Sequence, residues 1–142
     1  MRTGRLLAKA ALVAALMIGT AVGGDAAAAE DGERAAIAQT IDTYIEGGRK
    51  GSGDIMKGVF HEGANIYSAG GGGPIQLLFD LVDGKPPAGE IPYTIAALEI
   101  EENIAMARVE IPDWAGTNYT DMFTLLKTAD GWKIVSKVSC KH

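Results

Sequence analysis

The sequence has almost no cysteine. Cys140 is the only one among 142 residues, so no disulfide can form within the chain and burial must hold the fold. We expect Cys140 to be a buried strand residue, because free cysteines are among the most buried residue types; an intermolecular bridge is the alternative. Histidine is scarce too: only His61 and His142 occur, and no His, Cys and carboxylate cluster has metal-site spacing. We expect neither a metal nor a cofactor.

An excess of positive charge is also missing. The formal net charge is −5 for the whole chain. Residues 1–29 hold three basic residues and one acidic residue, so the net charge of residues 30–142 is −7. A surface this negative repels phosphate backbones, which argues against nucleic acid as a partner.

No apolar run is long enough to cross a membrane. The longest, residues 10–24, has a core of about 14 residues, short of the ~20 that a spanning helix needs. Basic residues precede it and small residues follow it, which is the layout of a secretory signal peptide cleaved near Ala28 and Ala29. We therefore expect a signal peptide over 1–29, one domain over 30–142, a periplasmic or secreted location, and no stable membrane anchor after cleavage. An uncleaved anchor is the alternative.

Helical periodicity dominates the first half of this domain. Ile37, Ile41, Tyr44 and Ile45 recur on one face, which predicts a helix over 35–49 with Asp31 as its cap. Beyond it, the glycines, prolines and apolar residues predict a helix over 54–60, a strand over 65–68, a loop over 70–73 and a helix that begins at Pro74 and ends at Gly84.

After the proline-rich segment 85–92 the period changes to two. Four strands are expected, over 93–101, 104–111, 119–128 and 132–140. Asp130-Gly131 between the last two strands is a strong hairpin signal. Helices followed by an antiparallel meander predict an α+β fold, with three helices packed on one face of a curved sheet.

Two stretches carry a family resemblance. One is IDTYIEG at residues 41–47 followed by VFHEGA at 59–64, and the other is DMFTLLK at 121–127 followed by DGWKIV at 130–135. Over residues 33–140 the chain resembles the nuclear transport factor 2-like superfamily, with its cystatin-like roll, and most closely its lumazine-binding-like family. The resemblance implies a cone-shaped sheet with an apolar pocket inside, and a relationship to ketosteroid isomerase and SnoaL-like proteins.

The same resemblance implies a site inside the cone. Tyr44 and Asp121 match the two oxyanion-hole residues of the isomerase pattern, where donors stabilise a developing enolate. The position of the catalytic base falls on Ser68, which has no basic group. His61 lies nearby on a predicted turn; there it is either a replacement base or a solvated residue. Asp121 has an alternative at the start of its strand, in contact with water, and Tyr44 has one as a core residue. The expected pocket residues are Tyr44, Phe60, Phe79, Phe123 and Asp121.

Because the base is missing, we expect a non-catalytic exported domain that binds a small apolar molecule or serves as an accessory protein. We expect it to form a homodimer through the outer face of its sheet. An isomerase-, cyclase- or dehydratase-like enzyme that uses Tyr44 and Asp121 is one alternative. A structural dimerisation module, whose cone is filled by its own side chains, is the other.

Overall fold

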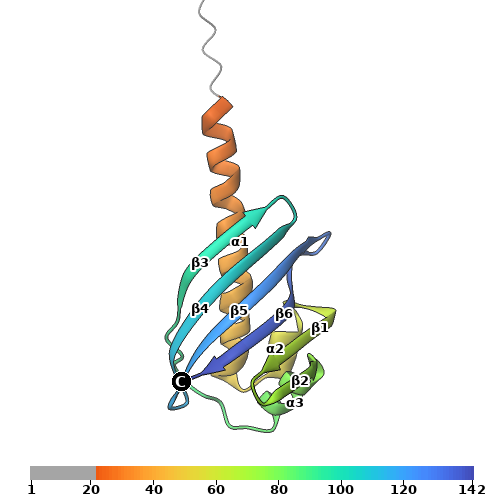
Figure 1. Ribbon diagram of the computed structural model, residues 1–142, viewed down its shortest axis with the longest axis vertical. Coiled ribbons are helices and arrows are strands. Elements are labelled where there is room, and N and C mark those ends of the chain that lie inside the picture. The colour runs from red at the N-terminus through yellow and green to blue at the C-terminus, as the bar shows by residue number, and fades with distance from the viewer. Residues whose placement is uncertain (1–21) are drawn as a thin grey trace, which may run out of the picture.

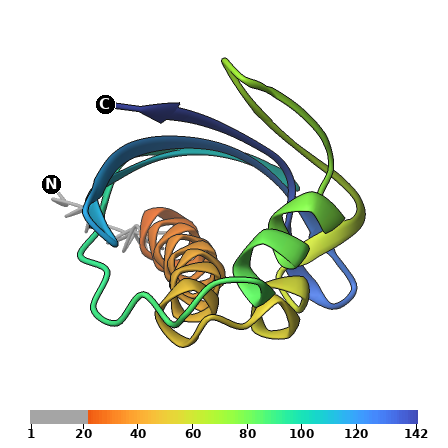
Figure 2. The same cartoon turned by 90° about the horizontal axis from the view of Figure 1, so that it is seen from below.

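A curved sheet wraps around one long helix (Figures 1 and 2). The computed structural model describes residues 22–142. In chain order the elements are α1 Val22–Lys50, α2 Gly53–Lys57, β1 Phe60–Ser68, β2 Gly71–Pro74, α3 Gln76–Asp83, β3 Thr94–Glu101, β4 Ile104–Trp114, β5 Thr117–Thr128 and β6 Gly131–Lys141. The predicted α+β class, with helices before an antiparallel meander, is confirmed.

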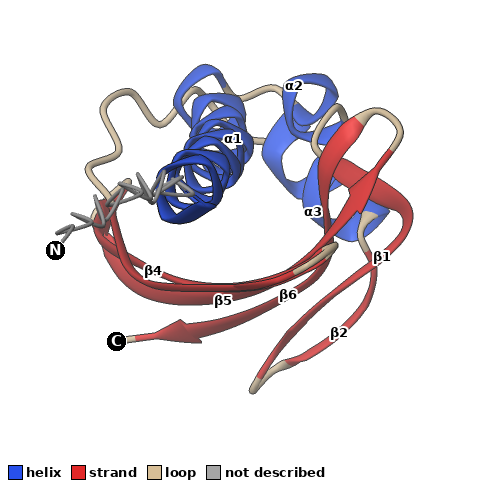
Figure 3. Ribbon diagram, turned by 90° about the horizontal axis from the view of Figure 1, so that it is seen from above, coloured by secondary structure: helices blue, strands red, loops and turns tan. Residues whose placement is uncertain are grey.

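The sheet has six strands in the order β2-β1-β6-β5-β4-β3. All neighbours are antiparallel except β1 and β6, which are parallel. Helix α1 lies along the concave face, while α2 and α3 close the end of the sheet formed by β1 and β2 (Figure 3). The sheet therefore has an outer convex face and an inner face that the helices cover.

Helix α1 starts earlier than the sequence pattern predicts. It begins at Val22 and continues through Asp31, so Asp31 is not a cap but an exposed residue within the helix. The residues from 23 to 32 are all exposed, and this part of α1 projects beyond the sheet (Figure 1). Most of the predicted signal peptide, residues 1–21, lies outside the described residues. Within residues 22–142, no helix is both long and apolar enough to cross a membrane.

Three further boundaries differ from the predictions. Helix α2 ends at Lys57, and Phe60 opens β1 because its backbone pairs with Ile134 of β6. The predicted loop over 70–73 is largely β2, a short strand whose last residue, Pro74, pairs with Asn65. Helix α3 therefore begins at Gln76, after Pro74 rather than with it.

The core lies between α1 and the inner face of the sheet. Ile37, Ile41 and Ile45 of α1 are fully buried, as the helical spacing predicts. On the strands, buried residues alternate with exposed ones, and Ala105, Ala107 and Val109 show this along β4. The buried side chains of both layers form one apolar cluster.

A β-bulge interrupts this alternation in β6. Thr124 pairs with Ser136 but its neighbour Leu125 pairs with Ile134, which leaves Val135 without a partner on β5. The extra residue shifts every later side chain of β6 to the opposite face. Lys137 therefore points inward and Cys140 outward. The prediction that Cys140 is buried was wrong; its thiol is exposed.

Candidate functional site

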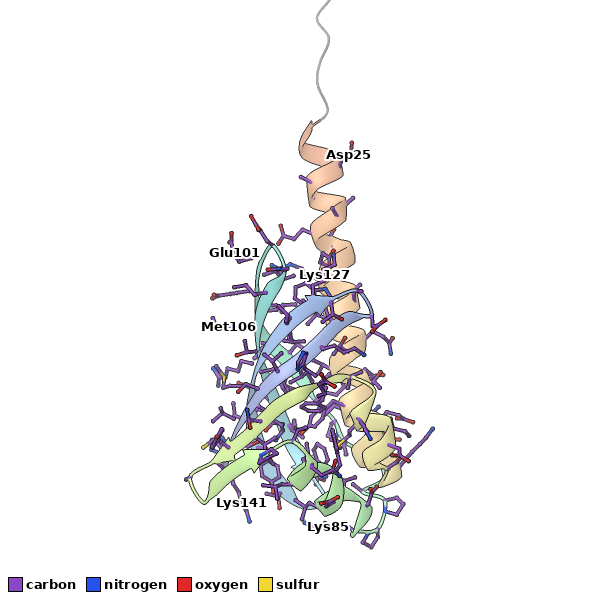
Figure 4. The ribbon with its side chains drawn as sticks, turned by 90° about the vertical axis from the view of Figure 1, so that its right-hand side faces the viewer. Asp25, Lys85, Glu101, Met106, Lys127 and Lys141 are labelled. Carbon is purple, nitrogen blue, oxygen red and sulfur yellow. The ribbon has the colours of Figure 1, made fainter. Side chains whose placement is uncertain are left out.

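A cavity of about 340 Å³ opens at one end of the inner face. Its walls come from the C-terminal half of α1, the β1–β2 hairpin, α3, the β4–β5 turn, and the ends of β5 and β6. Lys85, one of its residues, lies at the end of the molecule opposite Asp25 in the projecting part of α1 (Figure 4). Apolar side chains such as Leu78 and Val82 line most of it, which is typical of small-molecule sites.

Tyr44 and Asp121 meet in the wall of this cavity. The Tyr44 hydroxyl donates a 2.8 Å hydrogen bond to Asp121 Oδ2, and each residue is only 1% exposed. The alternative that Asp121 contacts water at a strand start was therefore wrong. Burial, followed by the charge of Asp121 and this hydrogen bond, raises the pKa of the Tyr44 hydroxyl well above its usual value. Tyr44 thus remains a neutral donor.

Lys137 and Ser139 complete a polar cluster that the sequence did not predict. Ser139 Oγ donates a 2.6 Å hydrogen bond to Asp121 Oδ1. Lys137 Nζ lies 3.2 Å from the same oxygen and also donates to Ser139 Oγ. Lys137 is 8% exposed and lines the cavity. Regular alternation from Trp132 places Lys137 on the outer face, so only the bulge at Val135 reveals its role.

The cluster leaves one donor free. An ammonium group carries three protons. Ser139 accepts one of those on Lys137 and Asp121 pairs with its charge, so among residues 22–142 no hydrogen-bond acceptor takes the third. The Lys137 nitrogen also lies over the Tyr44 ring, 5.7 Å from its centroid. A ligand oxygen inside the cavity can therefore take a hydrogen bond from Lys137.

Two aromatic rings line the cavity near the C-terminal end of α1. The rings of Trp114 and Tyr44 are 5.5 Å apart between centroids. Trp114 also rests on Gly48 of α1, where a Cβ would come within 2.2 Å of its ring. Gly48 therefore makes room for Trp114, and both residues line the cavity. The sequence analysis did not place Trp114 at the site.

Three of the expected pocket residues lie in the core instead. Phe60, Phe79 and Phe123 are buried, and the cavity wall does not include them. Phe60 and Phe123 pack edge to face against the inner side of the Tyr44 ring, with centroids 6.0 and 5.3 Å away. Phe60 and Phe123 therefore support the Tyr44 ring but do not fill the cavity. The alternative of a filled cone does not describe this fold.

His61 lies outside the cavity wall, whereas Ser68 is part of it. His61 lies where β1 pairs irregularly with β6; its Nδ1 accepts a 3.0 Å hydrogen bond from the Gly63 amide, and it is not part of the cavity wall. Ser68 is in the wall, and its hydroxyl bonds within the β1–β2 turn. Of the described residues that line the cavity, Asp121 is the only carboxylate. Residues 22–142 hold no cluster of potential metal ligands.

Comparisons with known proteins show which family and which solved structures this chain is similar to. The family model described as "Putative lumazine-binding" matches residues 32–139. A curated protein named "Aldolase FrzH", from Cladobotryum sp, is 31% identical over an alignment of 108 residues; the match covers 72% of this chain and 86% of that protein.

Solved structures with the same architecture include two bacterial proteins of unknown function that are described as NTF2-like. The one from Shewanella baltica is 37% identical with a TM-score of 0.72; the match covers 78% of this chain and 94% of that one. The one from Methylobacillus flagellatus is 30% identical with a TM-score of 0.73; the match covers 78% of this chain and 92% of that one.

Proposed function

The chain belongs to the lumazine-binding-like family of the nuclear transport factor 2-like superfamily, and from this premise we propose that it binds a small organic molecule with a carbonyl group. The observation that carries the proposal is the free proton of Lys137 in the wall of the cavity. A buried ammonium that keeps an unused donor beside an apolar space suits a ligand oxygen.

The cavity limits the size and character of this ligand. Its volume, about 340 Å³, is near the lower end of the range of small-molecule sites, which favours a compact ligand. Trp114 and Tyr119 offer aromatic surface, while Leu78 and Val82 offer aliphatic surface. An apolar molecule with one oxygen acceptor matches these walls better than a highly charged one.

Ligand-observed NMR with benzaldehyde and toluene tests this function. The two probes have similar shapes, but only benzaldehyde has a carbonyl oxygen. We expect benzaldehyde to bind about ten-fold tighter, because a hydrogen bond to a charged donor is worth more than 1.4 kcal/mol. In the double variant Lys137→Met with Asp121→Asn, which removes both buried charges together, the preference should disappear. Equal binding of both probes to the unmodified protein would contradict the proposal.

An aldol-type reaction is a second candidate function. The 31% identical protein named an aldolase favours it, and so does the position of Asp121 as a carboxylate in the cavity wall. Lys137 would hold the carbonyl oxygen while Asp121 accepts a proton from the adjacent carbon. Exchange of that carbon-bound hydrogen of a ketone such as acetophenone with D2O, followed by NMR, measures this step. The isosteric variant Asp121→Asn should abolish the exchange; exchange at the wild-type rate would exclude Asp121 as the base.

We also propose that the protein is exported. The basic start, the apolar run and the small residues near Ala28 and Ala29 support this. Cleavage after Ala29 would remove none of the described core residues, because the residues from 23 to 29 are exposed and Ile37 is the first fully buried residue in the described part of α1. Amino-terminal sequencing of protein from the culture medium or periplasm should begin at Glu30. A retained Met1 would refute cleavage.

Self-association through the outer face of the sheet is the final part of the proposal. Four large apolar side chains on β4, β5 and β6 are about half exposed there: Ile104, Met106, Met122 and Val138. Met106 lies on the side of the sheet away from α1 (Figure 4). Such a patch suits a second copy of the chain. Native mass spectrometry should show a homodimer that Met122→Lys converts to a monomer; a monomeric unmodified protein would contradict it.

A further inference from the structure

The polar cluster at the cavity contains a nucleophile that simple ligand binding does not need. Lys137 carries a primary amine, and its partner Asp121 can take a proton from it over the 3.2 Å between Nζ and Oδ1. Asp121 does not depend on this contact for its position, because Tyr44 and Ser139 each donate a hydrogen bond to it. The carboxylate is therefore held as a fixed proton acceptor beside the amine.

We propose that Lys137 bonds reversibly to the carbonyl carbon of its ligand and forms a protonated imine, which rests on the proposed carbonyl-binding function. The substrate class is an aldehyde or ketone small enough for the cavity. An amine next to an ordered carboxylate, with an apolar space in front of it, has the parts that imine formation requires.

Each proton in this reaction has a place to go. Asp121 accepts one proton from the Lys137 ammonium, and the neutral amine attacks the carbonyl carbon. The C–N bond forms as the C=O π electrons move to oxygen, which takes the proton back from Asp121. Asp121 then accepts a second proton from nitrogen and delivers it to the hydroxyl group, which leaves as water. The nitrogen lone pair closes the C=N bond.

The overall change is from an ammonium and a carbonyl to a protonated imine and one water molecule. The single positive charge stays on nitrogen, and Asp121 is again a carboxylate at the end. The buried ion pair therefore persists in a new form, so the product exposes no uncompensated charge. Ser139, which accepts from Lys137 and donates to Asp121, provides a second path for the same protons.

Reductive trapping with benzaldehyde and cyanoborohydride tests the inference. The reductant converts a protonated imine to a stable benzyl-amine, which intact mass and peptide mapping locate. We expect Lys137 to be labelled at least about ten-fold faster than the exposed Lys141, because binding brings the aldehyde next to the amine. Lys137→Arg keeps a cation beside Asp121 but forms no trapped imine, whereas the matched variant Lys141→Arg should leave the labelling of Lys137 unchanged.

A second readout separates this inference from the proposed function. Binding of benzaldehyde without reductant is followed by ligand-observed NMR in the same three proteins. If benzaldehyde binds but Lys137 is labelled no faster than Lys141, the imine is refuted while the binding function stands. If it neither binds nor labels, both fail. Fast labelling of Lys137 that toluene slows by competition supports both.

Discussion

The inner face of the sheet has two halves that differ in what fills them. In the filled half, Leu125, Ile134 and Trp132 belong to the same buried apolar cluster as Ile37 and Ile41 of α1. In the cavity half, Asp121, Lys137 and Ser139 of the same two strands form a polar cluster with Tyr44 in the wall of an open volume.

Strands β5 and β6 run through both halves, and the bulge at Val135 decides which β6 side chains face the cavity, but the open space has another cause. It follows from the cover: α1 lies over the filled half, whereas its glycine-rich end and the short α3 leave room over the other. One half is therefore held by apolar packing alone, whereas the other holds buried polar groups beside open space.

The largest expected effect is in the cavity half. Lys137→Met removes one partner of a buried ion pair and leaves Asp121 unpaired, which should lower the free energy of unfolding by about 3–5 kcal/mol. Urea denaturation measures it. Lys141→Met, on the same strand but exposed, should change little. If adding Asp121→Asn to Lys137→Met recovers none of the loss, the two charges do not stabilise each other.

In the filled half, a loss of side-chain volume should by itself lower the free energy of unfolding. Leu125→Ala opens a space in a closed core and should cost about 2–5 kcal/mol of unfolding free energy. Binding of benzaldehyde by the folded fraction should be unchanged, because Leu125 is not in the cavity wall. The neighbouring Leu126→Ala, only half-buried, should cost less. A loss of binding in Leu125→Ala would show that the halves are coupled.

Tyr44 lies at the border of the two halves, and its hydroxyl makes the stability of the protein depend on pH. Tyr44→Phe removes a hydrogen bond to a charged acceptor and should cost about 1.5–3 kcal/mol at neutral pH. Its raised pKa in the folded state means that only the unfolded chain loses this proton just above pH ~10. The stability of the unmodified protein should therefore fall as pH rises through this range.

Denaturation between pH 8 and 11 measures that slope. Tyr44→Phe should flatten it, but not to zero, because burial and Asp42 also raise the pKa of Tyr93. Tyr67→Phe, at an exposed residue, serves as the control and should retain the full slope. An unchanged slope in Tyr44→Phe would mean that another group controls it.

The smallest effect concerns two glycines of α1. Gly32→Ala meets no atom within 4 Å and should stabilise the helix by about 1 kcal/mol. Gly48→Ala brings the same helix preference, but its Cβ would lie 2.2 Å from Trp114, so the ring must move. Overpacking of this kind costs about 1–3 kcal/mol, which should cancel or reverse the gain. Thermal melting compares them, and the fluorescence of Trp114 should shift in Gly48→Ala only.

Most of the fold could be predicted from the sequence because it depends on repeated patterns. Four apolar residues at helical spacing located α1, and strict alternation located β3, β4 and β5. The start of α1 was missed because residues 23–34 bury no apolar face, so their helix has no periodic signal. Strand β2 was missed because its sequence, GGGP, has no side chains that favour a strand.

The site could be predicted only in part. Tyr44 and Asp121 came from the family resemblance, and the structure brings them into contact. Cys140 was assigned to the wrong face, and Lys137 was not singled out, for one shared reason: regular alternation from Trp132 omits the bulge at Val135. The pattern of β6 residues alone does not mark a bulge, since it depends on how the neighbouring strands pair.

Val135 has a consequence for how relatives of this protein are compared. A lysine aligned with Lys137 without a gap presents its amine to the cavity only if its strand also forms the bulge. Where the segment has the same length but no bulge, regular alternation turns the amine to the solvent side and brings Val138 inward. Where the extra residue is absent, the lysine faces the cavity without a bulge. Reactivity toward aldehydes should therefore follow how this segment pairs with β5, and identity at the lysine position alone would misclassify members of the family.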